Sequence, residues 1–328
     1  MQKKLICFFA LIYLLLFSGC TQSRQIYAMD TVITMEVSGL KAKDAIQLAE
    51  EEILRLEQLL SIRGGNSEVA ALNNRQIQTV SEDTAQVLQA ALSLSRATGG
   101  AYDCTIAPVA EAWGWYDSPT VPSEEELSQA LALVNHENLL LDGNSVEFRQ
   151  ADMGIDLGGI AKGYAAETLG NLLKNQGIQS GLISLGGNIR AIGKKTNSQP
   201  WIIGIADPSD PASYVATVAV EDTAVVTSGD YQRFFTENDR TYHHILDPKT
   251  GKPAENGLHS VTIVCQNDTM ADGLSTALFV MGLEDASSFW KIGWYDFEAI
   301  FIADSGLYIT EGLRDCFACQ TSYEVISR

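Results

Sequence analysis

The stretch DLGGIAKGYAAE, residues 156–167, is the most informative part of this chain. An extended, apolar-flanked segment gives way here to a helical pattern, with two glycines and a lysine at the junction. A helix start presents unpaired N–H groups and partial positive charge, glycine lets a ligand approach the backbone, and Lys162 could add a full charge. The junction therefore indicates a site for an anionic, nucleotide-like ligand. The alternative is an ordinary Gly-Gly loop before a helix.

Helical and strand-like patterns fall in long separate blocks around this junction. Apolar spacing and end signals predict helices, and a capping box at Ser123 and Glu126 starts one of them. Separate blocks of this kind favour an α+β fold over a doubly wound parallel sheet. Helices are expected at about 41–60, 81–98, 108–115, 123–134, 161–175, 270–281 and 284–290. Extended segments are expected at 26–37, 181–187, 201–206, 214–220, 224–227 and 260–264, with a hairpin at 298–310.

The first twenty residues have the pattern of an export signal. Lys3 and Lys4 precede an apolar run that ends in Ser18-Gly19-Cys20. A cysteine after a small pair is typical of lipoproteins, so we expect residues 1–19 to be removed, Cys20 to carry lipid such as palmitate, and 21–25 to form a tether. The protein would then be lipid-anchored on the extracytoplasmic face of the bacterial cell membrane. The alternatives are an ordinary cleaved signal and an uncleaved anchor, for which the run is short.

Composition limits the partners. The formal net charge is −19, and it becomes −21 once Lys3 and Lys4 are removed with the signal. Such an acidic surface repels nucleic acid and lacks the character of a basic membrane-binding patch. It also repels phosphate, so a diphosphate site would need a cation or a cluster of donors. The 309 residues that follow the signal are enough for one large domain or two packed lobes.

The cysteines give little chemistry. Of six, Cys7 lies in the signal and Cys20 is the proposed lipid site. Cys316 and Cys319 form a C-x-x-C pair, which could be a redox pair, half of a metal site or a disulfide. A zinc ribbon needs a second pair, which the sequence lacks. We favour a structural or incidental role for this pair.

Two further clusters could carry chemistry. In YHHILDPKTG, 242–251, turn formation explains the Asp-Pro and the final glycine but not His243 and His244. Adjacent residues of an extended segment face opposite ways, so only one histidine would enter a site, where it could act as a general base. TSGDY, 227–231, is a strand end that could bind a ligand or form an ordinary turn.

A possible metal site lies further along the chain. In a helix, Asp272 and Thr276 are four residues apart and share a face. A carboxylate and a hydroxyl, completed by carbonyl, water and phosphate oxygens, suit a hard cation such as Mg²⁺. The alternative is an N-cap aspartate with a threonine on the helix surface.

Taken together, the motifs resemble those of the ApbE family, the FAD:protein FMN transferases, in order and over about residues 26–312. They are AMDT (28–31), TGGAYDCTIAPV (98–109), WGW (113–115), DLGGIAKGYAAE (156–167), ISLGGNI (183–189), TSGDY (227–231), HHILDPKTG (243–251) and ADGLSTALF (271–279). Eight motifs in one order are far more specific than any single one.

The resemblance implies a single ApbE-like catalytic domain at 26–328, with mixed sheets, flanking helices and an active site in a cleft between two lobes. It implies Mg²⁺-dependent cleavage of FAD, with FMN attached through a phosphoester to a Thr or Ser and AMP released. The implied acceptors are flavoprotein subunits of membrane redox complexes or extracytosolic reductases. An FAD pyrophosphatase and a non-catalytic flavin-binding lipoprotein are the alternatives.

The resemblance also implies roles for individual residues. His244 matches the catalytic base, and the metal ligands correspond to the Gly159 carbonyl, Asp272 and Thr276. Three departures from the family pattern are Asp30 in place of a common glycine, Arg63 in place of an aromatic residue that stacks on the flavin, and Gly273 in place of a common alanine. FAD-contact positions fall on Met29, Ala112, Trp113, Gly114, Asp156, Lys162 and Leu246.

Overall fold

A nine-stranded sheet organises the chain. The computed structural model describes residues 21–64 and 67–328, and within them this sheet has the order β1-β2-β5-β6-β9-β12-β13-β14-β16. Neighbouring strands are antiparallel except β14 and β16. The strands are β1 (Thr21–Ala28), β2 (Thr31–Ser38), β5 (Ser180–Leu185), β6 (Asn188–Gly193), β9 (Ala224–Gly229), β12 (Leu258–Cys265), β13 (Glu298–Ala303), β14 (Gly306–Thr310) and β16 (Glu324–Ile326).

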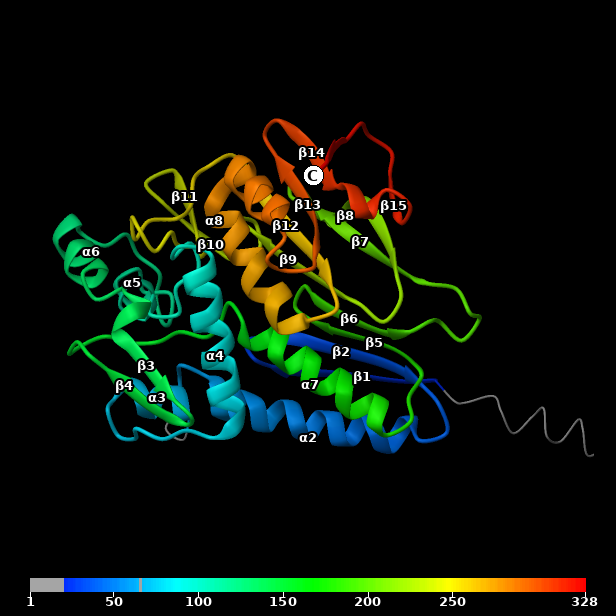
Figure 1. Cartoon of the computed structure of the whole chain (residues 1–328), viewed down its shortest axis with the longest axis horizontal. Helices are drawn as coiled ribbons and strands as arrows, with labels where there is room; N and C mark the ends of the chain where they lie inside the picture. Colours follow the sequence, from blue (N-terminus) through cyan, green and yellow to red (C-terminus); the bar gives the residue numbers. More distant parts are fainter. Residues whose placement is uncertain (1–20, 65–66) are drawn as a thin grey trace, which may run out of the picture.

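Helices cover one face of this sheet (Figure 1). They are α2 (Ala42–Leu60), α4 (Glu82–Ala97), α7 (Ala161–Asn175) and α8 (Asp268–Ile292). The helices predicted at 41–60, 81–98 and 161–175 are thus confirmed, and α2 buries the predicted apolar stripe. The helices predicted at 270–281 and 284–290 are the two halves of α8, which kinks at Gly282, where φ is 79°. Glycine tolerates this backbone conformation at no steric cost.

A smaller sheet covers part of the opposite face. It consists of β15 (Phe317–Cys319), β8 (Asp210–Val220) and β7 (Trp201–Asp207). Successive side chains of a strand point to opposite faces of the sheet, so alternate residues of the central strands pack against the helices and against the smaller sheet. Ile263 and Phe301 pack toward the helices, whereas Val264 and Ile300 pack toward β7 and β8. The predicted α+β class, with mixed sheets and flanking helices, is therefore confirmed.

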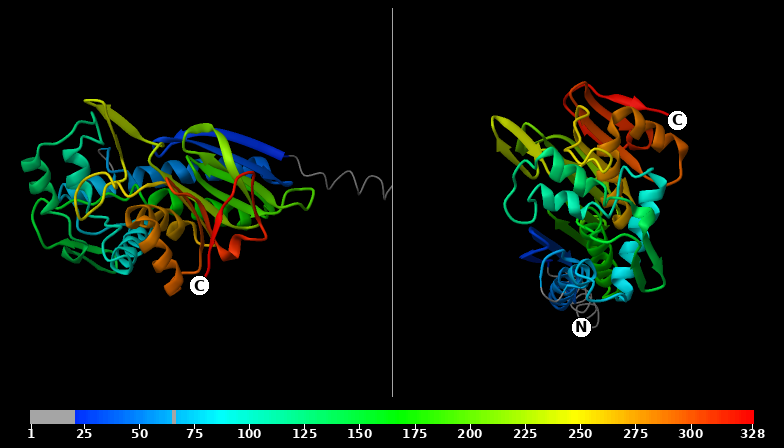
Figure 2. Two further views of the ribbon diagram at one scale, coloured as in Figure 1. Left: turned by 90° about the horizontal axis from the view of Figure 1, so that it is seen from above. Right: turned by 90° about the vertical axis from the view of Figure 1, so that its left-hand side faces the viewer.

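Most of the remaining elements form a smaller lobe at one end of the molecule (Figure 1). Its apolar core includes Trp113, Trp115 and Leu127. The capping box of Ser123 and Glu126 is present at the start of α6, as predicted. Figure 2 shows the β10–β11 hairpin projecting from the body of the protein. The lobe contains α3 (Glu68–Asn73), α5 (Ala107–Ala112), α6 (Glu124–Leu131), η1 (His136–Asn138), β3 (Leu139–Asp142), β4 (Ser145–Phe148), β10 (Phe234–Glu237) and β11 (Arg240–His243).

The start of the described chain corrects two predictions. The extended segment expected at 26–37 is a hairpin that turns at Met29 and Asp30, both with positive φ. Residues 21–25, predicted to be a tether, are the first half of β1 and pair in register with β2. Arg24 also makes a two-point ion pair with Glu50 of α2, at 2.8 and 2.9 Å. Backbone pairing and this ion pair hold the polar segment in the sheet.

The proposed signal and Cys20 lie outside the described residues. Among the residues that are described, no helix is both long enough and apolar enough to cross a membrane.

Candidate active site

A cleft of about 400 Å³ lies between the helix-flanked sheet and the smaller lobe. Residues from several of the sequence motifs, which lie far apart in the chain, meet in this cleft. The residues that face it include Met29, Arg63, Tyr102, Trp115, Tyr116, Asp156, Gly159, Lys162, Ser228, Arg233, His244, Leu246, Asp272 and Thr276.

The glycine-rich junction meets α8 at one wall of the cleft. The Gly163 backbone N–H, near the start of α7, donates a 2.8 Å hydrogen bond to Asp272 Oδ2. A Cβ on Gly163 would lie 2.3 Å from the Asp268 carbonyl oxygen and 2.6 Å from Asp272 Cβ. Glycine is therefore required here for close packing of two helices. Part of the helix start predicted to hold a ligand anion is already occupied by a carboxylate of the protein itself.

The three predicted metal ligands come together at this wall. A Cβ on Gly159 would lie 3.5 Å from Thr276 Oγ1, so these residues are direct neighbours. Asp272 lies one helical turn before Thr276 on α8. Ser228 supports this corner, because its hydroxyl is 3.3 Å from Thr276 Oγ1 and 2.8 Å from Ser275 Oγ.

The donor set of this corner fits a hard cation. Within residues 21–64 and 67–328, no group of three or more His, Cys, Asp or Glu side chains is arranged to hold a metal. A cation bound here would therefore use one carboxylate together with hydroxyl, carbonyl and water oxygens, which Mg²⁺ accepts. Tyr102 lies against Gly159, and its buried hydroxyl has no hydrogen-bond partner among the described residues. Burial raises the pKa of this phenol well above its usual value, so it stays neutral.

His244 is the histidine that faces the cleft. Its backbone N–H and its ring Nδ1 both lie 3.1 Å from the Arg233 carbonyl oxygen. A carbonyl only accepts, so Nδ1 carries the proton and Nε2 keeps a lone pair. Burial, together with the nearby cations Lys162 and Arg233, lowers the pKa of this imidazole to about 3. His244 is therefore neutral at physiological pH.

His243 points the other way, as the alternation of an extended segment predicts. Its Nε2 donates to the Ala254 carbonyl at 3.1 Å, and its ring lies edge-on to Phe279 at 5.6 Å. It belongs to the packing behind the cleft.

Two arginines line the cleft at the Trp115 carbonyl, and the family resemblance pointed to Arg63 alone. The Nη2 atoms of Arg63 and Arg233 both donate to the Trp115 carbonyl, at 3.2 and 2.8 Å. Arg63 also lies over the Tyr116 ring, 5.8 Å from its centroid. With Lys162 they place three cations around a cleft in a chain whose net charge is −19. The only sequence signal for Arg233 is its place two residues after the TSGDY motif.

The family model described as the ApbE family matches residues 29–301 of this sequence. The chain belongs to the ApbE family. Among similar proteins, the FAD:protein FMN transferase of Vibrio cholerae is 32% identical over 291 residues, which are 84% of this chain and 87% of that protein. The FAD:protein FMN transferase of Treponema pallidum is 34% identical over 286 residues, 80% of this chain and 79% of that protein.

Solved structures agree with the ApbE assignment. The ApbE protein from Thermotoga maritima superposes with a TM-score of 0.84 at 31% identity, covering 90% of this chain and 99% of that one. The flavin transferase ApbE from Vibrio cholerae superposes with a TM-score of 0.81 at 27% identity, covering 91% and 99%.

Within this ApbE fold, the WGW motif contributes differently from the prediction. Ala112, Trp113 and Gly114 are not among the described residues that line the cleft. Trp113 is only 3% exposed and donates its indole N–H to the Gly251 carbonyl at 2.7 Å. Within the aromatic core of the smaller lobe, its ring also contacts Phe235 and Tyr242, with centroids 6.3 and 5.3 Å away. Trp115 and Tyr116 reach the cleft instead.

The other predicted FAD-contact residues of this ApbE protein do line the cleft. Met29 occupies the β1–β2 turn, and Leu246 follows β11. Asp156 braces the glycine-rich turn, because Oδ1 accepts from the Gly158 N–H at 2.7 Å and Oδ2 accepts from the Tyr116 hydroxyl at 2.6 Å. Lys162 folds back over the same turn, with Nζ 3.0 Å from the Gly158 carbonyl.

Proposed function

We propose that this protein is an FAD:protein FMN transferase. It would cleave FAD, attach FMN through a phosphoester to a Thr or Ser hydroxyl of an acceptor flavoprotein, and release AMP. The observation that carries the proposal is a neutral histidine with a free Nε2 in the same cleft as three cations and the oxygen-rich corner at Asp272. The names of the relatives support the same activity.

His244 is the general base of this proposal. Nε2 accepts the proton of the acceptor hydroxyl as that oxygen attacks the phosphorus of the FMN moiety. The bond from this phosphorus to the bridging oxygen breaks, and that oxygen leaves with AMP. The bond from Nδ1–H to the Arg233 carbonyl fixes the ring and stabilises its protonated form. FAD phosphates bring negative charge beside the ring, which raises its low pKa and makes it a stronger base.

Three cations supply positive charge for the diphosphate. Arg63 and Arg233 are anchored on the Trp115 carbonyl and can still present further N–H groups, because a guanidinium has five. Lys162 adds an ammonium from the glycine-rich junction. Preorganised donors stabilise the charge that develops on the phosphoryl oxygens, and positioning accounts for much of the remaining rate.

The Gly159 carbonyl, Asp272 and Thr276 would hold Mg²⁺. When bound, this ion offsets the charge of the diphosphate and polarises a phosphoryl oxygen. The protein orients its own ligands: the Gly163 N–H fixes the Asp272 carboxylate, and the Ser228 hydroxyl lies against that of Thr276.

In the deciding experiment, purified protein is incubated with FAD, Mg²⁺ and a flavin-acceptor domain. The masses of the acceptor peptides are then measured by mass spectrometry. A mass increase of one FMN on a Thr or Ser peptide is the expected result. Rapid release of free FMN without labelling would instead indicate an FAD pyrophosphatase. Unchanged FAD with stable binding would indicate a flavin-binding lipoprotein.

We also propose that Cys20 carries the lipid anchor and that the protein works on the extracytoplasmic face of the cell membrane. Support comes from the signal pattern at 1–19 and from the cysteine that directly follows Ser18 and Gly19. Acceptors would be flavoprotein subunits of membrane redox complexes or extracytosolic reductases. Cell fractionation tests this: Cys20→Ala should move the protein out of the membrane fraction, and equal membrane retention would contradict the anchor.

A further inference from the structure

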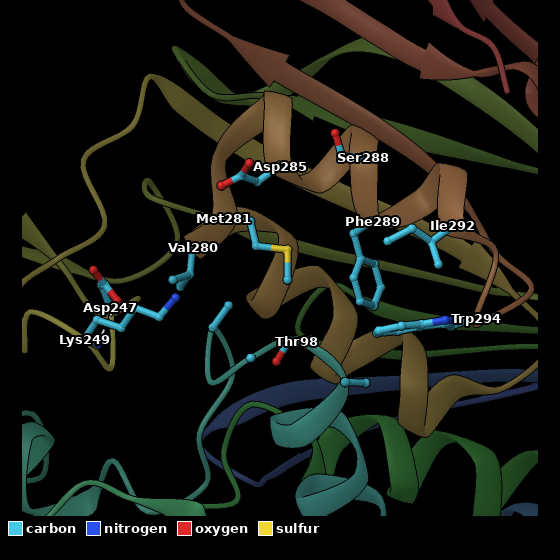
Figure 3. Close-up of a pocket in the computed structure, with 13 residues that line it drawn as sticks. Thr98, Asp247, Lys249, Val280, Met281, Asp285, Ser288, Phe289, Ile292 and Trp294 are labelled. Carbon is cyan, nitrogen blue, oxygen red and sulfur yellow. Dashed lines mark hydrogen bonds between the residues drawn. The ribbon is translucent and has the colours of Figure 1, made fainter.

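A second cavity, of about 430 Å³, shares Ala101 with the cleft, and Figure 3 shows the residues that line it. It lies between the end of α4, the kinked helix α8 and the loop that follows Leu246. We call it the side groove. Its floor is largely apolar and comes from both sides of the Gly282 kink in α8 and from the loop after this helix. The floor residues are Val280, Met281, Phe289, Ile292 and Trp294.

The side groove exposes large apolar side chains. Trp294 is 62% exposed and Ile292 57% exposed. Trp294 is held edge-on against the buried ring of Phe289, with ring centroids 6.0 Å apart. Contiguous exposed apolar surface of this kind marks interaction sites, and tryptophan is enriched among the residues that dominate binding energy.

One loop separates the side groove from the catalytic cleft. His244, Leu246 and Pro248 line the cleft, whereas Asp247 and Lys249 line the side groove. Ala101 lines both cavities. A chain segment that presents a hydroxyl to His244 therefore has to cross only this loop to enter the side groove.

The charged residues of the side groove lie at its two ends, with Asp247 and Lys249 on the loop and Asp285 on α8. Asp247 is satisfied within its own turn, by the Lys249 N–H at 2.9 Å and the Thr250 hydroxyl at 3.1 Å. The Lys249 ammonium has no hydrogen-bond or ion-pair partner in the described part of the chain. Asp285 lies on the α8 side (Figure 3). Because the Asp247 carboxylate already accepts hydrogen bonds within its own turn, the Lys249 ammonium is the group at this end that can pair with a carboxylate of a bound partner.

We propose that the side groove binds the acceptor protein next to the hydroxyl that is modified. The bound segment carries an acidic side chain that pairs with Lys249 and a large apolar side chain that packs on Trp294. This inference rests on the proposed function and adds a recognition rule for its protein substrate.

The test measures flavin transfer to an acceptor domain that the parent enzyme labels. Trp294→Ala and Lys249→Glu should each raise the KM for the acceptor about tenfold, the size of effect expected for a central interface residue. The KM for FAD should not change. Tyr214→Ala and Lys43→Glu are the matched controls, because Tyr214 is 68% exposed and Lys43 is exposed on α2. Both should behave like the parent.

A charge swap makes the test specific. Replacing the acceptor's acidic residues near its modified hydroxyl by lysine, one at a time, should identify one change that weakens labelling by the parent and restores labelling by Lys249→Glu. An acceptor KM within twofold of the parent in both side-groove variants would overturn the inference. Loss of liposome binding by Trp294→Ala with an unchanged acceptor KM would overturn it too and would point to a membrane contact. Absence of labelling by the parent itself would refute the proposed function as well.

Discussion

The carbonyl oxygen of Arg233 lies 3.1 Å from both the backbone nitrogen and the ring Nδ1 of His244. One backbone acceptor thus fixes both the position of the residue and the tautomer of its ring. The same residue directs its guanidinium to the Trp115 carbonyl, 2.8 Å away. Arg233 therefore couples the orientation of the base to the positive charge of the cleft.

His244→Gln should abolish transfer and preserve FAD binding. Removing a general base costs about 10²–10⁴ in rate. The measurement is FMN transfer at saturating FAD, together with FAD affinity by flavin fluorescence. His243→Gln is the control, since that histidine lies outside the cleft and should leave most of the rate. Equal losses in both variants would show that the defect is structural and would remove the base assignment.

The pH dependence of kcat/KM follows from the low pKa of His244. A base whose pKa is about 3 in the free enzyme is already deprotonated above that pH, and kcat/KM reports the free enzyme. We therefore expect no acid limb near pH 6.5 and less than about a threefold change between pH 5.5 and 7.5. Lys162→Gln removes a cation that lowers this pKa, so its acid limb should move upward. A tenfold fall of the parent below pH 6.5 would contradict this account.

Substitutions at the oxygen-rich corner should change the response to Mg²⁺. Asp272→Asn keeps the size of the side chain and removes its charge, so activity should fall at least about a hundredfold and stop responding to Mg²⁺. Thr276→Val removes a hydroxyl and should raise the Mg²⁺ concentration needed for half-maximal rate, whereas Thr276→Ser should not. The readout is a Mg²⁺ titration of FMN transfer. Full activity of Asp272→Asn in a chelator would refute the assignment.

The sequence predicted correctly those helices that are determined by the spacing of apolar residues and by the residues at their ends. The apolar stripe of α2 and the capping box of α6 were both read correctly, because spacing and end residues determine them. The β10–β11 hairpin was missed although Asn238 and Asp239 suit its turn, and both have positive φ. Its strands are only four residues long and leave Phe234 exposed, which weakens the alternation of a strand.

For the site, too, the residues that residue type and local pattern identify were predicted, and those that depend on tertiary packing were not. The glycine-rich junction, Asp272 and His244 stand out by residue type and were placed in the cleft correctly. Arg233 acts partly through its backbone carbonyl. Every residue has such a carbonyl, so the residue type does not reveal this role. Trp113 and Trp115 are alike in the sequence and both are buried, and only tertiary packing decides that the second lines the cleft and the first does not.

His259 should make the protein more stable below neutral pH. Its ring hydrogen-bonds Asp230 at 2.9 Å and Asp304 at 3.0 Å, which raises its pKa above the ordinary value. The resulting stabilisation is fully present below the unfolded pKa of about 6.5 and is lost as pH rises through the folded pKa. With 39% of the side chain exposed, solvent screening limits the effect to about 1 kcal/mol.

The measurement for His259 is the difference in unfolding free energy between parent and His259→Gln at pH 6 and at pH 8.5. The parent's advantage should be present at pH 6 and shrink at pH 8.5. An advantage that is the same at both pH values would assign it to packing.

Substitution by alanine should destabilise the protein strongly at one buried glycine, Gly163, and only slightly at another, Gly273. At Gly163 a methyl group would meet backbone atoms of Asp268, which cannot move aside, so Gly163→Ala should cost about 3 kcal/mol and displace Asp272. At Gly273 it would meet the tip of the Leu94 side chain, which can rotate, and alanine favours the helix by about 1 kcal/mol. Gly273→Ala should therefore stay within about 1 kcal/mol of the parent. Urea unfolding measures both, with Mg²⁺-dependent transfer as the second readout. If Gly163→Ala kept parental stability and activity, the contact between α7 and α8 would not be what positions the Asp272 carboxylate.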